Sequence, residues 1–144
     1  MKSITVNDLK VAYLDEGPVG GETVILAHCA SASSKEWQSL TLLLTRAGYR
    51  VLVPDFCGYG RSEPWPDNRP FDADADVNIL RALVDLVEGP VHFVGHSHGG
   101  MLVLESACLL GDRVRSMTII EPTVFQLLHE TGHRQIDEKG RAGI

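Results

Sequence analysis

A serine between two glycines, in Gly95-His96-Ser97-His98-Gly99, has the sequence setting of a nucleophile. The mostly apolar residues 91–94 before it predict a short buried strand, and the mainly apolar run 101–110 after it predicts a helix that ends at Gly111. A serine on such a strand-to-helix turn projects its hydroxyl out of the sheet, and the backbone N–H of the next residue points beside it. The matching chemistry is attack on an acyl carbon, with the positive helix end stabilising the negative charge that develops.

Glycines suit this turn, because a Cβ at Gly95 or Gly99 would collide where the helix folds back across the strand. We expect Ser97 itself at positive φ, a strained conformation that is tolerated mainly where function uses the strain. A serine that only caps a helix after a glycine turn is the alternative interpretation. The flanking strand and helix favour the nucleophile.

At this point the sequence resembles the α/β-hydrolase family, in which Ser97 would be the nucleophile. The stretch from His28 to Trp37 resembles the His-Gly loop that follows the family's third strand and ends in a tryptophan. The resemblance implies that the backbone N–H of Ala30 completes an oxyanion hole with the N–H of His98. The sequence departs from the family at Cys29, where the family usually has glycine.

Cys29 is also an alternative nucleophile. No motif places a base beside it, and a small packed thiol is the commoner role for a cysteine.

A second loop, residues 55–62, matches the family's D-x-x-G-x-G-x-S pattern. Its glycines permit tight turns, and the side chains of Asp55 and Ser62 can bond N–H groups of the loop. We therefore expect a scaffold beside the pocket. A phosphate site is not predicted, because the loop has neither the Walker lysine spacing nor a full G-x-G-x-x-G pattern.

Strands and helices that alternate from residue 23 onward must position these loops. The expected strands are a hairpin over 3–16 that turns at Asn7-Asp8, then 23–27, 50–54, 91–94 and 113–120. Three helices are expected. The first starts at the capping-box pair Ser33 and Glu36 and ends at Gly48. The second follows Asp72, Asp74 and Asp76 and ends at Gly89-Pro90, and the third spans 101–110. This order predicts an α/β fold with a doubly wound, mostly parallel sheet.

In such a fold the active-site loops gather at the carboxyl ends of the strands. The polar residues that follow predicted strands are His28, Asp55, Ser97 and Glu121.

A serine needs a base to take its proton, and the base needs an orienting acid. The family's order is serine, acid, histidine. Downstream of Ser97, only Glu121 stands at a strand end, and His129 and His133 lie where the family begins its cap. His96 and His98 flank the serine, where the turn directs them away from its hydroxyl.

The resemblance covers about six of the family's usual eight strands. We expect residues 1–121 to form an incomplete α/β-hydrolase core and residues 122–144 to begin a cap or a linker. The chain alone should then be inactive. Its partner would be a C-terminal remainder of the same protein, or another copy, that covers the edge at 113–120 and supplies the missing groups.

Composition limits the other partners. A net charge of −6 without a basic cluster disfavours nucleic acid and anionic membranes, and no stretch is apolar enough to span a bilayer. Three cysteines in a chain whose start lacks a signal peptide predict reduced thiols and a cytoplasmic location. We expect no cofactor and no metal.

The sequence thus predicts a serine hydrolase that cleaves an ester or related small acyl compound through an acyl-enzyme. A carbon–carbon bond hydrolase or a haloperoxidase-like member of the same fold stays open. Serine at the turn argues against dehalogenases and epoxide hydrolases, which use aspartate there. Two other classes remain: a metal-dependent hydrolase that uses His28, His96 and His98, and a non-catalytic binding protein on a hydrolase scaffold.

Overall fold

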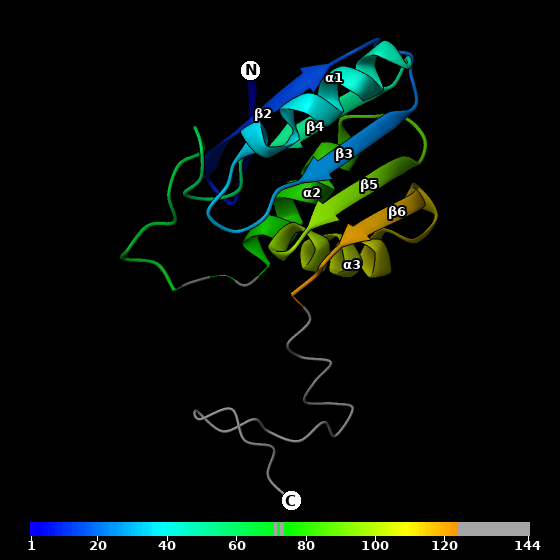
Figure 1. The fold of residues 1–144 in the computed structure, drawn as a ribbon. Helices are drawn as coiled ribbons and strands as arrows, with labels where there is room; N and C mark the ends of the chain where they lie inside the picture. The colour runs from blue at the N-terminus through cyan, green and yellow to red at the C-terminus, as the bar shows by residue number, and fades with distance from the viewer. Residues whose placement is uncertain (71, 73, 124–144) are drawn as a thin grey trace, which may run out of the picture.

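The computed structural model describes residues 1–70, 72 and 74–123 (Figure 1). Its strands are β1 (Lys2–Val6), β2 (Leu9–Glu16), β3 (Thr23–Ala27), β4 (Arg50–Pro54), β5 (Val91–His96) and β6 (Val114–Ile120). Its α-helices are α1 (Gln38–Arg46), α2 (Ala75–Asp85) and α3 (His98–Leu110), and two 3₁₀ helices are η1 (Ser34–Trp37) and η2 (Gly111–Arg113). None of these helices is long and apolar enough to cross a membrane.

The strands form one six-stranded sheet in the order β1-β2-β4-β3-β5-β6. The β1–β2 and β2–β4 pairs are antiparallel, whereas β4, β3, β5 and β6 run parallel. β4 lies on one side of β3 and β5 on the other, so the winding direction reverses between β3 and β5. Ligands of open α/β sheets bind outside the carboxyl ends of the strands at such a reversal.

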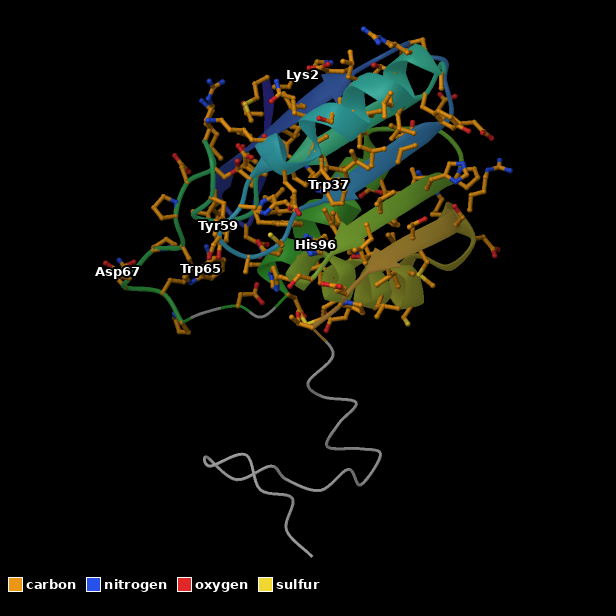
Figure 2. All side chains as sticks on the ribbon, in the orientation of Figure 1. Lys2, Trp37, Tyr59, Trp65, Asp67 and His96 are labelled. Atoms are coloured by element: carbon orange, nitrogen blue, oxygen red, sulfur yellow. The ribbon has the colours of Figure 1, made fainter. Side chains whose placement is uncertain are left out.

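Helices cover both faces of the sheet, with α1 on one face and α2 and α3 on the other (Figure 1). On the α1 face, Trp37 packs on the apolar side chains of β3 and β4 (Figure 2). Leu40 and Leu44 pack against the same cluster. The larger core lies beneath α2 and α3. All five residues of β3 are buried, as expected of a strand covered on both faces. The predicted doubly wound, mostly parallel sheet is confirmed.

Several predicted boundaries were wrong by a few residues. Helix α3 begins at His98 rather than at 101, β5 extends to His96, and β6 begins at Val114 because η2 occupies the residues before it. Most of the predicted cap or linker, from residue 124 onward, lies outside the described residues.

The capping box at the start of the first helix does not form. Ser33 does accept a hydrogen bond from the backbone N–H of Lys35, at 3.4 Å, where η1 begins. The carboxylate of Glu36, however, contacts Cys29 and His96 instead of returning to Ser33. The helix start was therefore predicted correctly, but the role of Glu36 was not.

Candidate active site

The G-x-S-x-G turn joins β5 directly to α3, and Ser97 is its one linking residue. Its backbone lies at φ 52° and ψ −114°, outside both helical and extended conformations. A Cβ at Gly95 would meet the backbone of Gly99 and Gly100, and a Cβ at Gly99 would meet the backbone of Ala27 and His28. The positive φ and the two glycine requirements are thus as the sequence predicts.

The backbone of Ser97 is tied to the end of β6. Its N–H donates to the carbonyl of Ile120 at 2.9 Å, and its carbonyl accepts from the N–H of Thr123 at 3.3 Å. The Ser97 side chain is partly exposed, and its hydroxyl makes no hydrogen bond to any described residue. The turn therefore fixes the main chain of the serine while leaving its hydroxyl available.

Near this turn, the backbone N–H groups of Ala30 and His98 have no acceptor within the described part of the chain. His98 opens α3, so its N–H lies at the positive end of the helix. Ala30 precedes Ser31, which lies at φ 67°. The convergence of the two N–H groups on one point stays a prediction.

Within the described residues, positive φ values at residues other than glycine follow a pattern. Two of them, Asn7 and Asp8, form the predicted hairpin turn. The other three, Ser31, Ser97 and Glu121, follow the carboxyl ends of β3, β5 and β6. Strained backbone of this kind clusters at functional sites, and here it marks the edge where the winding of the sheet reverses.

His28 is a structural residue and not a base. The residue is fully buried. Its Nε2 accepts a hydrogen bond from the backbone N–H of Phe56 at 3.1 Å, so the ring proton must lie on Nδ1. Nδ1 donates this proton to the carbonyl of Cys29 at 2.7 Å. Burial lowers its pKa, which favours this neutral form. His28 therefore connects its own loop to the loop after β4.

Asp55 performs the matching task in the second loop. It is 1% exposed, and its two carboxylate oxygens accept from the backbone N–H groups of Ser34 at 2.7 Å and of Arg61 at 3.0 Å. Ser62 donates its hydroxyl to the carbonyl of Asp55, and Gly60 lies against the carboxylate, where a Cβ would not fit. The loop is a scaffold, as predicted.

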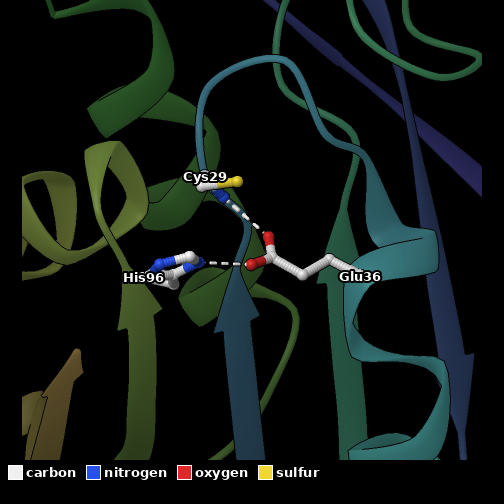
Figure 3. Close-up of side chains that lie close together, drawn as sticks. All are labelled: Cys29, Glu36 and His96. Atoms are coloured by element: carbon white, nitrogen blue, oxygen red, sulfur yellow. Dashed lines mark hydrogen bonds and ion pairs between the residues drawn. The ribbon is translucent and has the colours of Figure 1, made fainter. Parts of the chain in front are cut away.

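Glu36 joins the loop after β3 to the serine turn (Figure 3). One carboxylate oxygen accepts from the backbone N–H of Cys29 at 2.7 Å, and the other lies 2.5 Å from Nδ1 of His96. Burial raises the pKa of the Cys29 thiol, and the nearby Glu36 carboxylate raises it further. Because a raised pKa suppresses the thiolate, this setting disfavours Cys29 as the nucleophile.

Asp76, in the first turn of α2, has a second role beside its place at the helix start. Its carboxylate accepts from the backbone N–H of Cys57 at 3.2 Å and lies 3.3 Å from Nε2 of His98. Burial first, and Asp76 second, raise the pKa of Cys57 to about 11. Both histidines that flank Ser97 are therefore paired with carboxylates, not with its hydroxyl.

Glu121, the candidate acid, follows β6 at φ 42° with an exposed side chain. Its carboxylate has no partner among the residues that the structure describes. His129 and His133, the two downstream histidines, lie outside that part of the chain. The assignment of acid and base therefore stays open.

The proposed trio of metal-binding histidines does not assemble among residues 1–70, 72 and 74–123. His28 uses both ring nitrogens for backbone contacts, and His98 pairs with Asp76. Within that range, the group whose atoms come close enough to share an ion is Cys29, Glu36 and His96. The sequence indicated His96 as a metal ligand only together with His28 and His98. It indicated Cys29 as an alternative nucleophile and gave Glu36 only a capping role.

Similarity to known proteins agrees with this geometry. The family model described as alpha/beta hydrolase fold matches residues 22–142. The chain belongs to the α/β-hydrolase family. Among its hydrolase-family relatives, "Lipase LipV" of Mycobacterium tuberculosis is 35% identical over 75% of this chain and 40% of that protein. "Non-heme chloroperoxidase" of Streptomyces lividans is 36% identical over 69% of this chain and 36% of that protein.

Solved α/β-hydrolase structures agree with the fold. Epoxide hydrolase A from Mycobacterium thermoresistibile superposes with a TM-score of 0.73 at 30% identity, covering 82% of this chain and 37% of that one. A thioesterase domain from the curacin biosynthetic pathway superposes with a TM-score of 0.76 at 23% identity, which shows the fold alone. The chain thus spans less than half the length of these α/β hydrolases.

Proposed function

We propose that this α/β hydrolase acts as a serine hydrolase on an ester or related small acyl compound, with Ser97 as the nucleophile. The observation that carries the proposal is the backbone of Ser97 at φ 52° between β5 and α3. Ser97 attacks the acyl carbon, its proton passes to a base, and the leaving group departs from the acyl-enzyme. Water then attacks the acyl carbon, releases the acid and restores the serine hydroxyl.

The N–H groups of Ala30 and His98 are the proposed donors to the oxyanion that forms in both steps. Neither donates to another described residue, so both are free to bond a substrate oxygen. Donors that are fixed in advance lower the barrier because they need no reorganisation as the charge develops. Glu121 is the proposed acid if the family's less common arrangement applies, with the histidine downstream.

We infer that the whole reaction needs groups beyond the described residues. Among the described strands, β6 is an edge of the sheet; five of its seven residues are exposed, and Met117 and Ile120 are 47% and 41% exposed. An unguarded edge offers its free backbone groups to another strand. We propose that a C-terminal remainder of the same protein, or a second copy, pairs with β6, and that residues 1–144 alone are inactive.

The free thiols of all three cysteines support a reducing, cytoplasmic location.

The alternative within the family is haloperoxidase-like chemistry, which the similarity to the Streptomyces lividans chloroperoxidase favours. It would use the same Ser97 but divert the acyl-enzyme to peroxide instead of water, so that a peracid forms. Halogenation that requires both a carboxylic acid and peroxide would identify this activity. Hydrolysis of p-nitrophenyl esters without peroxide would identify the leading one.

Fluorophosphonate labelling of the complete protein tests the nucleophile directly. We expect one covalent adduct, located at Ser97 by peptide mass spectrometry. The Ser97→Ala variant should lose the adduct and nearly all ester turnover. Its kcat should fall by up to about a millionfold, the loss that follows when the serine of a comparable triad is removed. A Ser116→Ala variant, which removes another serine from the neighbouring strand, is the control and should retain both. Undiminished turnover in Ser97→Ala would refute the assignment.

A further inference from the structure

Cys29, Glu36 and His96 bring a sulfur, an oxygen and a nitrogen ligand together beside the serine turn. The three ligand atoms lie within 4.8 Å of one another (Figure 3). They come from three separate elements: the loop after β3, the helix η1 and the end of β5. The side chains of His96 and Glu36 are 32% and 19% exposed, so an ion can reach them from solvent.

We propose that Cys29, Glu36 and His96 bind one divalent transition-metal ion of the zinc type. Zinc takes thiolate, imidazole and carboxylate ligands at about 2.0–2.3 Å in a tetrahedral arrangement. Ligand atoms in such a site lie about 3.3–3.8 Å apart. His96 and Glu36 must separate slightly from 2.5 Å, and the thiol must approach them. Cys29 lies on a loop, and the approach requires rotation of its side chain.

The charges of the site also fit a divalent cation. A thiolate, a carboxylate and a neutral imidazole carry two negative charges together, which one divalent ion neutralises. The carboxylate is already oriented, because its other oxygen is held by the backbone N–H of Cys29 at 2.7 Å. Partners of this kind fix a ligand in place and strengthen a metal site. Three protein ligands leave a fourth position for water or another small ligand.

The protonation of Cys29 determines how binding depends on pH. A free thiol has an ordinary pKa of about 8.5, so it is mostly protonated at neutral pH when no ion is bound. Zinc must displace this proton. We therefore expect zinc binding to release a proton and the apparent affinity to rise with pH.

The site is distinct from the proposed serine chemistry, although it lies next to it. Cys29 precedes Ala30, and His96 precedes Ser97, so an ion would join the two segments that carry the oxyanion donor and the nucleophile. Binding to the folded protein only would also raise its stability, by an amount that grows with the logarithm of the ion concentration once that concentration exceeds the Kd. Neither consequence requires Ser97 to be the nucleophile.

Zinc titration of the 144-residue chain against a chromophoric chelator tests the proposal. We expect one equivalent bound with a Kd of about 1 µM or tighter, weaker than four-ligand structural sites. Cobalt in place of zinc should give the intense near-ultraviolet charge-transfer absorption of a thiolate ligand. Cys29→Gly, which restores the family's usual residue, should remove this band and weaken binding at least about tenfold. Glu36→Gln, which keeps the shape of the side chain, should weaken binding to a similar extent.

The controls remove ligand types from elsewhere in the chain. Cys108→Ser removes an exposed thiol on α3, and the double variant His129→Gln/His133→Gln removes the downstream histidines. Both should bind zinc like the unmodified chain. The circular dichroism spectrum of each variant, compared with that of the unmodified chain, tests whether the variant folds. The proposal is overturned if no equivalent binds, if cobalt shows no thiolate band, or if folded Cys29→Gly binds with unchanged affinity.

Discussion

Replacing Ser97 with glycine should stabilise the protein while abolishing its nucleophile. At φ 52° and ψ −114° a Cβ crowds the backbone, and glycine adopts this conformation freely. A residue held in such a sparsely populated region costs about 1–3 kcal/mol. Ser97→Gly removes this cost, whereas Ser97→Ala keeps the Cβ and therefore keeps the strain.

The expected size of the effect follows from two opposed terms. Glycine gains conformational freedom in the unfolded chain, which costs about 0.4–1 kcal/mol of stability. The relief of strain exceeds this cost, so Ser97→Gly should be more stable than Ser97→Ala by about 1 kcal/mol. The hydroxyl does not enter this difference, because both variants lack it.

Urea unfolding at 25 °C, followed by circular dichroism, measures this difference in the free energy of unfolding. The matched control is the same pair of changes at Ser39, which is exposed in the helix α1. There the glycine variant should be the less stable by about 1 kcal/mol, because glycine is a poor helix former. A Ser97→Gly variant no more stable than Ser97→Ala would show that the turn stores no strain, and would remove the main support for the nucleophile.

Two further predictions concern the sheet. Asp15 pairs with both Arg50 and Lys2, and the hydrogen bond from Arg50 is the main cause that lowers its pKa from 3.8 to about 2. The stabilisation from these ion pairs is present above about pH 4 and is lost as pH falls through about 2. Asp15→Asn should therefore lower the free energy of unfolding by about 2 kcal/mol at pH 7 and by progressively less between pH 4 and 2, measured by urea unfolding at each pH. A loss of stability independent of pH would contradict the ion-pair explanation. Purified residues 1–144 should self-associate and show no ester turnover, and Met117→Lys on β6 should shift the mass measured by light scattering toward the monomer. A soluble monomer with Ser97-dependent turnover would refute the need for a C-terminal remainder.

Features that depend on residues close together in the sequence were predictable from it. The G-x-S-x-G turn specifies its own conformation, because Gly95 and Gly99 are the residues on which the tight crossing of β5 and α3 depends. The buried strand at 23–27 was equally clear, since an unbroken apolar run fits a strand covered on both faces. The start of α3 was missed because His98-Gly99-Gly100 carries no apolar signal, and only the turn geometry makes these residues helical.

Contacts between distant residues could not be predicted in the same way. Glu36 lies 60 residues from His96, and Asp76 lies 22 residues from His98. The spacing of Ser33 and Glu36 does match a capping box, but Cys29 and His96 offer Glu36 a backbone donor and an imidazole. A sequence pattern describes only neighbours along the chain, so it could not show which partner would prevail.

The bonds between Ser97 and β6 also constrain the order in which this protein can become functional. Ile120 and Thr123, which hold the backbone of Ser97, follow it in the chain and leave the ribosome later. The turn thus cannot complete its backbone hydrogen bonds until more than twenty further residues have been made and β6 has joined the sheet. Synthesis of the serine and assembly of its site are therefore separate events, and a chain interrupted before residue 120 would carry the motif without the support that fixes it.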